Sequence, residues 1–543
     1  MEALELKNDK TKSFFNDRYI WLLLIISLSV RIYLSFFTYV IKNDSVAFMQ
    51  IAKYFASGDF SSGLGHDYHP LYSLIMAALY KVVPNMELSG TIVSVFFGTL
   101  TVITFYLIGK NIFDRKIAFV SSIILAFHPY AVRFSADIIS ESTYFFFFIS
   151  ALGSGYFAIT NRKLLLFALT GICSALAYLA RPEGIGIIII VASWCAFKDC
   201  INIKVLWKEK LVSILVLIVS FLVFSMPYLV YIKKETGNWR LTKKKNVSHM
   251  AGVEERFHGQ NSDILAGKDD VKQVNSSSDN IKQVAARKTD FQIHINSILH
   301  MTKKYINTFH PFLFMFFIFG VINWSRIRKR KLFGFYIITV IAFYFFILHR
   351  LSITYLRGGD DIFMYPSRRH LMPLVIPAIF CVGLGVYTVG AWIHGKFHNC
   401  NLIVGFKELL RSTWTIQLIV LIVVVCVLLP KTLKPQRLDK LGIKKAGLWV
   451  REHSHKSPVI LGMSPRSAYY AGGKHIQMEN INETLVLARV KNVDFILITQ
   501  KEYRTIEEEL LRSIKGGKIA LAYKYPEKEL LSRRSILLYK ALY

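Results

Sequence analysis

The sequence has few cysteines and few acidic residues for its length. Six of 543 residues are cysteine, and 36 Asp and Glu stand against 67 Lys and Arg, for a formal net charge of +31. The cysteines lie in or near apolar runs or in short basic loops, and none lies in a large polar segment: Cys173, Cys195, Cys200, Cys381, Cys400 and Cys426. Their spacing excludes a disulfide framework and a cysteine zinc site.

Two further signals are missing. No glycine-rich phosphate loop is present, which argues against a nucleotide-binding fold. No small-residue cleavage site follows the first apolar run, 19–41, and that run is too long for the core of a signal peptide. We therefore expect this run to stay in the protein as a membrane anchor.

Apolar residues dominate the chain. They make up 53% of it, and the mean hydropathy of +0.38 is typical of a polytopic membrane protein. Eleven runs approach the roughly 20 residues that cross a bilayer as a helix: 19–41, 89–109, 117–132, 140–159, 164–180, 184–198, 209–232, 309–323, 332–349, 371–394 and 412–429. A shorter run, 70–83, fits a re-entrant or interfacial helix or a twelfth span.

The distribution of basic residues favours one of these alternatives for 70–83. If the N-terminus is cytoplasmic and 70–83 does not cross, every cytoplasmic loop is basic, as the positive-inside rule requires. The basic groups are Lys110/Arg115/Lys116, Arg162/Lys163, Lys204/Lys208/Lys210, Arg326/Arg328/Lys329/Arg330/Lys331 and Lys396/Lys407/Arg411. Orientation in an inner or plasma membrane thus explains the positive charge, and we expect no nucleic-acid binding.

This topology predicts three parts. Residues 1–18 are a cytoplasmic segment, 19–430 the transmembrane region, and 431–543 an external domain. External loops at 42–88, 233–308 and 350–370 interrupt the transmembrane region. The loop 233–308 is rich in polar clusters, and we expect it to be mobile.

The last 110 or so residues alternate between helix and strand patterns. Helical spacing occurs at 438–453, 482–490 and 503–514, and strand patterns at 459–463, 494–499, 519–525 and 535–542. The expected fold is an all-α polytopic membrane protein with a small C-terminal α/β domain.

Ionisable residues concentrate on the predicted external side. Asp44 follows the first run, and Asp137 and Glu141 are four apart at a predicted helix start, so we expect them to share a helix face. Their alternative role is capping and solvation. His66, Asp67 and His69 have ligand chemistry for a metal, but most histidines in such a loop pattern are solvated or hydrogen-bonded, so we assign no metal. Arginines suited to clamp a phosphate, or simply to reach the interface, are Arg181, Arg357, Arg368 and Arg369.

The first external loop resembles that of polyprenyl-phosphate-sugar-dependent glycosyltransferases of the GT-C class. This superfamily (glycosyltransferase family 39-like) includes protein O-mannosyltransferases and lipid A aminoarabinose transferases. Its pattern is an acidic residue after the first span, an aromatic four on and Ile/Leu-Ala seven and eight on; here these are Asp44, Phe48, Ile51 and Ala52. The family often has Glu after the Asp, whereas this chain has Ser45. Further matches, in order, are G-K-N-I-F-D-R-K at 109–116, H-P-Y-A-V-R-F-S-A-D-I-I-S-E-S at 128–142, L-A-R-P-E-G at 179–184, T-G-N-W at 236–239 and R-R-H-L-M-P at 368–373.

The resemblance covers about 19–430 and implies a chemistry. Such enzymes move a sugar, with inversion, from a polyprenyl-phosphate donor to an acceptor on the external face, without a nucleotide cofactor. It implies Asp44 as general base. The implied substrate-binding residues are Asp137, Glu141, His69, Arg181, Tyr365, Arg368 and His370. A lipid, glycan or protein acceptor stays open, as do two other functions: a transporter or lipid flippase, and a non-catalytic envelope-assembly scaffold.

Overall fold

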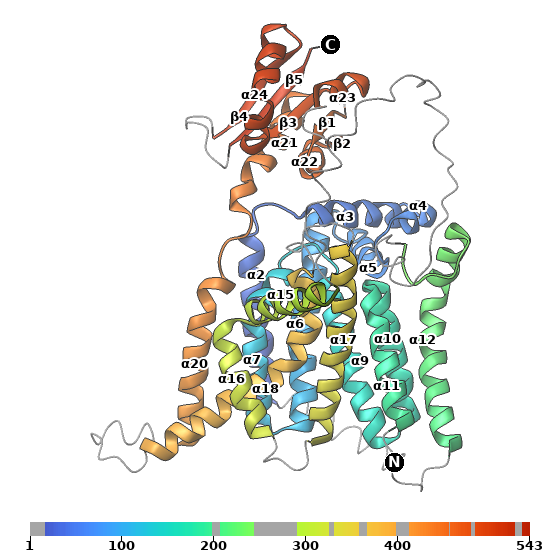
Figure 1. Ribbon diagram of the computed structural model, residues 1–543, viewed down its shortest axis with the longest axis vertical. Helices are drawn as coiled ribbons and strands as arrows, with labels where there is room; N and C mark the ends of the chain where they lie inside the picture. The colour runs from blue at the N-terminus through green and yellow to red at the C-terminus, as the bar shows by residue number, and fades with distance from the viewer. Residues whose placement is uncertain are drawn as a thin grey trace.

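The computed structural model describes residues 17–197, 207–243, 290–324, 331–357, 366–397, 412–454, 457–478, 484–526 and 535–542. A helical bundle forms its larger part, and a small α/β domain covers one end of the bundle (Figure 1). This end, which also carries Asp44, is called the domain-side end below. The opposite end is called the distal end.

Seven helices of the described residues are long and apolar enough to cross a bilayer. They are α2 (Arg18–Phe36), α6 (Met86–Ile112), α9 (Glu141–Asn161), α12 (Trp207–Thr236), α17 (Lys331–Arg357), α18 (Arg368–Phe397) and α20 (Thr413–Thr432). Two bent helix pairs raise the number to nine if each pair is one span. The chain is therefore a multi-pass membrane protein.

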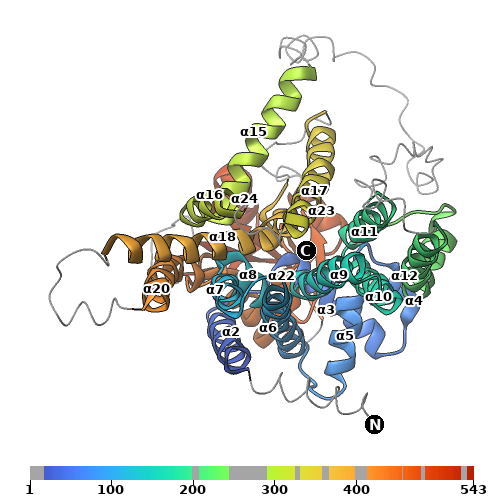
Figure 2. The same ribbon diagram turned by 90° about the horizontal axis from the view of Figure 1, so that it is seen from below.

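Eleven full-length spans were expected, and the difference lies in the middle of the chain. Helix α10 (Leu164–Ala180) and the pair η1 (Pro182–Ile185) and α11 (Gly186–Phe197) are shorter apolar helices. They nevertheless run beside α9 and α12 within the bundle (Figures 1 and 2). Neighbouring helices bury α10, so its stability does not depend on length alone.

The run 117–132 was expected to be one helix, and this is wrong. Helix α7 (Arg115–Ala126) ends before Pro129, which begins α8 (Pro129–Ser135), and the two axes differ by 60°. Proline lacks the N–H that would continue the hydrogen bonding of α7, whereas at a first helical position this loss costs little.

The expectation of a mobile loop at 233–308 is wrong for its last part. Helix α15 (Asp290–Phe309) lies across the bundle and meets α16 (Pro311–Trp324) at 97° (Figure 1). Its buried residues Ser297, Met301 and Thr308 follow helical spacing. Two of the three are polar, so a pattern of apolar residues does not reveal this buried face. Residues 244–289 of the loop lie outside the described residues.

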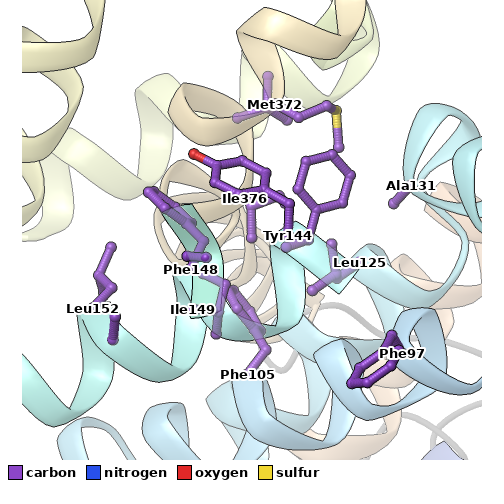
Figure 3. Close-up of a cluster of buried hydrophobic side chains, with 14 of the residues drawn as sticks. Phe97, Phe105, Leu125, Ala131, Tyr144, Phe148, Ile149, Leu152, Met372 and Ile376 are labelled. Atoms are coloured by element: carbon purple, nitrogen blue, oxygen red, sulfur yellow. The ribbon is translucent and has the colours of Figure 1, made fainter. Parts of the chain in front are cut away.

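The bundle core packs aromatic and aliphatic side chains from α6, α7, α8, α9 and α18 (Figure 3). Phe105 and Phe380 stack with ring centroids 3.8 Å apart. Helices α16 and α18 approach so closely that a Cβ on Gly385 would lie 1.9 Å from the Phe316 carbonyl oxygen. Small residues permit such contacts between membrane helices.

Three short helices cover the domain-side end: α3 (Asn43–Ala56), α4 (Phe60–Gly65) and α5 (Leu71–Tyr80). Helix α3 lies flat across the bundle (Figure 1). The ten residues of α5 extend about 15 Å, which is half the bilayer core. The segment 70–83 therefore has the length of an interfacial or re-entrant helix, not of a twelfth span.

The C-terminal domain holds a five-stranded sheet in the order β2-β1-β3-β5-β4. Its elements are η4 (Leu438–Lys440), α21 (Leu441–His453), β1 (Val459–Gly462), α22 (Arg466–Ala471), β2 (Lys474–Gln477), α23 (Thr484–Val490), β3 (Phe495–Thr499), α24 (Gln500–Lys515), β4 (Ile519–Tyr525) and β5 (Ile536–Ala541). Strand β1 pairs in parallel with β2 and β3, whereas β5 pairs antiparallel with β3 and β4. The four expected strands are present; α22 and β2 were not predicted.

Candidate active site

Asp44 lies in the first turn of α3, where the partial positive charge of a helix N-terminus favours a carboxylate. The turn begins because Lys42 is extended and its backbone N–H donates to Ser45 Oγ at 3.2 Å. Ser45 thus takes a capping role at the position where the related family often has an acid. One carboxylate, not two, is available here.

Two side chains hold the Asp44 carboxylate. The Tyr68 hydroxyl donates to Oδ1 at 3.1 Å, and Arg369 Nη1 lies 2.5 Å from Oδ2. Burial, and then the nearby Asp44 charge, raise the pKa of Tyr68, so its phenol stays protonated and can donate. The Asp44 side chain is 25% exposed and therefore within reach of a substrate.

Glu141 is the first residue of α9 and lies deeper. Its Oε1 accepts from Arg181 Nη1 at 2.8 Å and lies 3.7 Å from Arg369 Nη1. The side chain is only 1% exposed, and Oε2 makes no hydrogen bond within the described part of the chain. Arg369 therefore joins Asp44 to Glu141.

Arg181 continues the line of charges. Its Nη2 and Nε contact Glu183 Oε1 and Oε2 at 2.8 and 3.3 Å, in the short helix η1. We call Asp44, Arg369, Glu141, Arg181 and Glu183 the charge network. Three carboxylates alternate with two guanidinium groups, so the network carries one excess negative charge.

Asp137 lies outside this network. Helix α9 begins only at Glu141, so Asp137 and Glu141 do not share a helix face, contrary to the sequence prediction. Asp137 pairs with Lys42 Nζ at 2.8 Å and with the guanidinium of Arg437. Burial opposes ionisation of Asp137, but the two cations outweigh it and hold its pKa below the usual range.

Asp137 thereby ties the C-terminal domain to the bundle. The Arg437 Nε also donates to the Val40 carbonyl, and the Gln436 N–H donates to the Phe37 carbonyl at 2.9 Å. These contacts hold the segment that leads into Asp44. The resemblance implies a substrate contact for Asp137; in the structure its carboxylate is buried and pairs with Lys42 and Arg437.

Of the predicted residues not yet placed, His69, Arg368 and His370 lie in the described part of the chain. His69 is buried, with its ring edge-on to Tyr178 and Tyr228 at 5.1 and 5.2 Å. His370 Nδ1 accepts from the Ser367 N–H at 3.2 Å. Tyr365 lies outside the described residues. In the part of the chain that is described, no three His, Cys, Asp or Glu are arranged to hold a metal ion.

A second group of charges surrounds Tyr130 of α8. Arg368 Cζ and Lys431 Nζ lie 5.0 and 5.2 Å from the ring centroid, and Arg133 interacts electrostatically with Arg368. We call Arg133, Arg368 and Lys431 the cationic cluster. Within the described ranges no carboxylate forms an ion pair with Arg368 or Lys431, so the cluster favours an anion.

Sequence reasoning missed several of these residues. It named Arg369 only as one of four arginines, and it did not single out Tyr68, Glu183, Lys431 or Arg437. Glu183 had a local signal, because it lies beside Arg181 in the R-P-E-G motif. The partners of Arg369 and Arg437 had none, since they are 325 and 300 residues away.

Residues 67–231 match the family model described as dolichyl-phosphate-mannose-protein mannosyltransferase. That stretch includes His69, Asp137, Glu141 and Arg181 but not Asp44. A sequence comparison with curated proteins gives no match.

The fold is similar to that of two solved structures. ArnT from Cupriavidus metallidurans bound to undecaprenyl phosphate is 10% identical with a TM-score of 0.54, over 96% of this chain and 97% of that chain. The apo oligosaccharyltransferase of Archaeoglobus fulgidus is 11% identical with a TM-score of 0.51, over 90% of this chain and 70% of that chain. The resemblance to GT-C class glycosyltransferases is thus confirmed by family model and fold.

Proposed function

We propose that this protein transfers a sugar from a polyprenyl-phosphate donor to an acceptor hydroxyl at the domain-side end of the bundle, with Asp44 as general base. One observation carries the proposal. Asp44 is a partly exposed carboxylate at one end of a network whose other members fix its position. Asp137 and Glu141 are both 1% exposed, and a base must reach the proton that it removes.

Arg369 connects the base to the donor in this proposal. It lies between Asp44 and Glu141, and it follows Arg368 of the cationic cluster. A phosphate held by Arg368 and Lys431 competes with Asp44 for Arg369. A shift of Arg369 toward the phosphate leaves Asp44 free to accept a proton, and it stabilises the leaving phosphate.

Donor class and orientation have separate support. The solved ArnT structure contains undecaprenyl phosphate, which is a phosphate on a long apolar chain. The basic loops at the distal end, such as Lys110 to Lys116, favour a cytoplasmic location for that end. The reaction would then take place on the external face.

The test uses a strain that lacks the gene. Mass spectrometry of its surface glycans and lipids, and of its glycosylated proteins, identifies the product that is lost. Complementation with the wild-type chain restores the product, and Asp44→Asn reduces its formation by about 10²–10⁴-fold at equal membrane abundance.

Asp59→Asn is the matched control. Asp59 lies in the same external loop and caps α4 through Ser62 N, a role that asparagine fills equally well. This variant should complement fully. Complementation by Asp44→Asn at the wild-type level would contradict the assignment of the base, and unchanged glycans in the deletion strain would contradict the enzymatic function.

A further inference from the structure

A pocket of about 400 Å³ opens at the distal end of the bundle, away from the charge network. Its lining residues come from the ends of α9 and α11 and the starts of α10 and α12. These helix ends lie at the distal end of the bundle (Figure 1). Ile159, Phe167 and Val212 give it an apolar lining. Its position separates it from the proposed reaction.

The polar lining of the pocket is mainly cationic. Arg162, Lys208 and Lys210 contribute three positive charges, and Glu209 contributes one negative charge. Lys210 is largely buried, and its Nζ donates to the Ala196 carbonyl at 3.2 Å. Lys210 lines the pocket, and water screens a buried cationic side chain less than an exposed one.

The pocket also continues onto the lipid-facing surface. Leu164 and Val212 line the pocket and are 46% and 44% exposed. Leu165, which follows Leu164, and Leu211, which precedes Val212, are exposed as well. An occupant with an anionic head and apolar chains would therefore find complementary surfaces for both parts.

We infer that this pocket binds the phosphate headgroup of an anionic phospholipid, with the acyl chains along the start of α10 and α12. Basic pockets between helices at the cytoplasmic side of membranes suit such headgroups. Arg162 supports the phosphate from the end of α9, where its left-handed backbone (φ 55°) turns the chain into the basic loop. The inference does not depend on the proposed sugar transfer.

The experiment is native mass spectrometry of the detergent-solubilised full chain with dioleoyl phosphatidylglycerol. The wild-type protein should retain this lipid, and it should retain phosphatidylcholine several-fold less. The double variant Arg162→Gln/Lys208→Gln should bind phosphatidylglycerol roughly 25-fold more weakly, at about fivefold per cationic side chain. Equal retention of both lipids by the wild-type protein would overturn the inference.

Two further variants keep the result interpretable. Lys233→Gln/Lys234→Gln removes two charges from the opposite end of α12 and should leave binding unchanged. Val212→Trp fills the pocket without changing its charge and should also reduce retention, in a protein that stays monodisperse with an unchanged melting temperature. Wild-type retention by Val212→Trp, or equal competition by inorganic phosphate, would contradict a lipid site.

Discussion

The hydroxyl of Tyr470 accepts a hydrogen bond from the backbone N–H of Ile41 at 3.1 Å, across 429 residues of sequence. Ile41 precedes Asp44 by three residues, and Ser464 Oγ donates to Asn43 Oδ1 at 2.8 Å beside it. Together with Arg437, these residues make the C-terminal domain a support for the segment that carries Asp44.

Tyr470→Phe should loosen this segment. The variant leaves the buried Ile41 N–H without its acceptor, which costs about 1–3 kcal/mol. Hydrogen exchange of peptides that cover residues 37–44 should become faster, while the bundle core stays protected. Tyr503→Phe, on α24 of the same domain, is the control. Equal protection of residues 37–44 from exchange in both variants would contradict the support of this segment by Tyr470.

Arg369→Gln should change the pH dependence of the reaction. Asp44 and Glu141 would lose the cation between them, and two neighbouring carboxylates take up protons more readily. The acid limb of the pH–rate profile should therefore move to higher pH. Lys434→Gln changes an exposed lysine outside the charge network and the cationic cluster and should keep the limb where it is, so a shift in both variants would contradict this role.

Arg368→Gln/Lys431→Gln should weaken donor binding. Each of these side chains can give a charge-assisted hydrogen bond to a phosphate, worth about 1.5–3 kcal/mol. Binding of undecaprenyl phosphate, measured by titration in detergent, should fall by at least about 100-fold. Lys434→Gln changes an exposed lysine three residues beyond Lys431 and should bind as the wild type does.

Asp137 should make the protein sensitive to acid. Its pKa is depressed in the folded state, so the stability that it contributes is present above an unfolded pKa of about 4 and is lost as pH falls through the folded pKa. Melting temperatures between pH 7 and pH 3 should fall in the wild type below about pH 4.

Asp137→Asn should remove part of this acid response and destabilise the protein by about 3 kcal/mol at neutral pH, because it breaks a buried ion pair. Asp439→Asn changes an exposed acid near Arg437 and should retain the acid response of the wild type. If the melting temperature of Asp137→Asn followed that of the wild type at every pH, the ion pairs of Asp137 would not be the source of the acid response.

The outcome of the sequence predictions differs between local and long-range features. Strand patterns at 459–463 and 494–499 gave β1 and β3 because a buried strand shows continuous apolar residues. Helix α15 was missed because polar and apolar residues are mixed along it, so its sequence contains no long apolar run. Arg181 and Glu183 of the R-P-E-G motif pair with each other, whereas the spacing of Asp137 and Glu141 wrongly predicted a shared helix face, because α9 begins only at Glu141.

By itself, the sequence determined a polytopic membrane protein with a C-terminal α/β domain and a first loop like that of GT-C enzymes. The length and the periodicity of apolar runs depend on the burial of each segment, so the spans and the C-terminal domain could be predicted from the local sequence. Only the tertiary structure decided that Asp44 meets Arg369 and that Asp137 meets Arg437. Such pairs depend on how distant helices pack, and no local pattern specifies the partner of a charge.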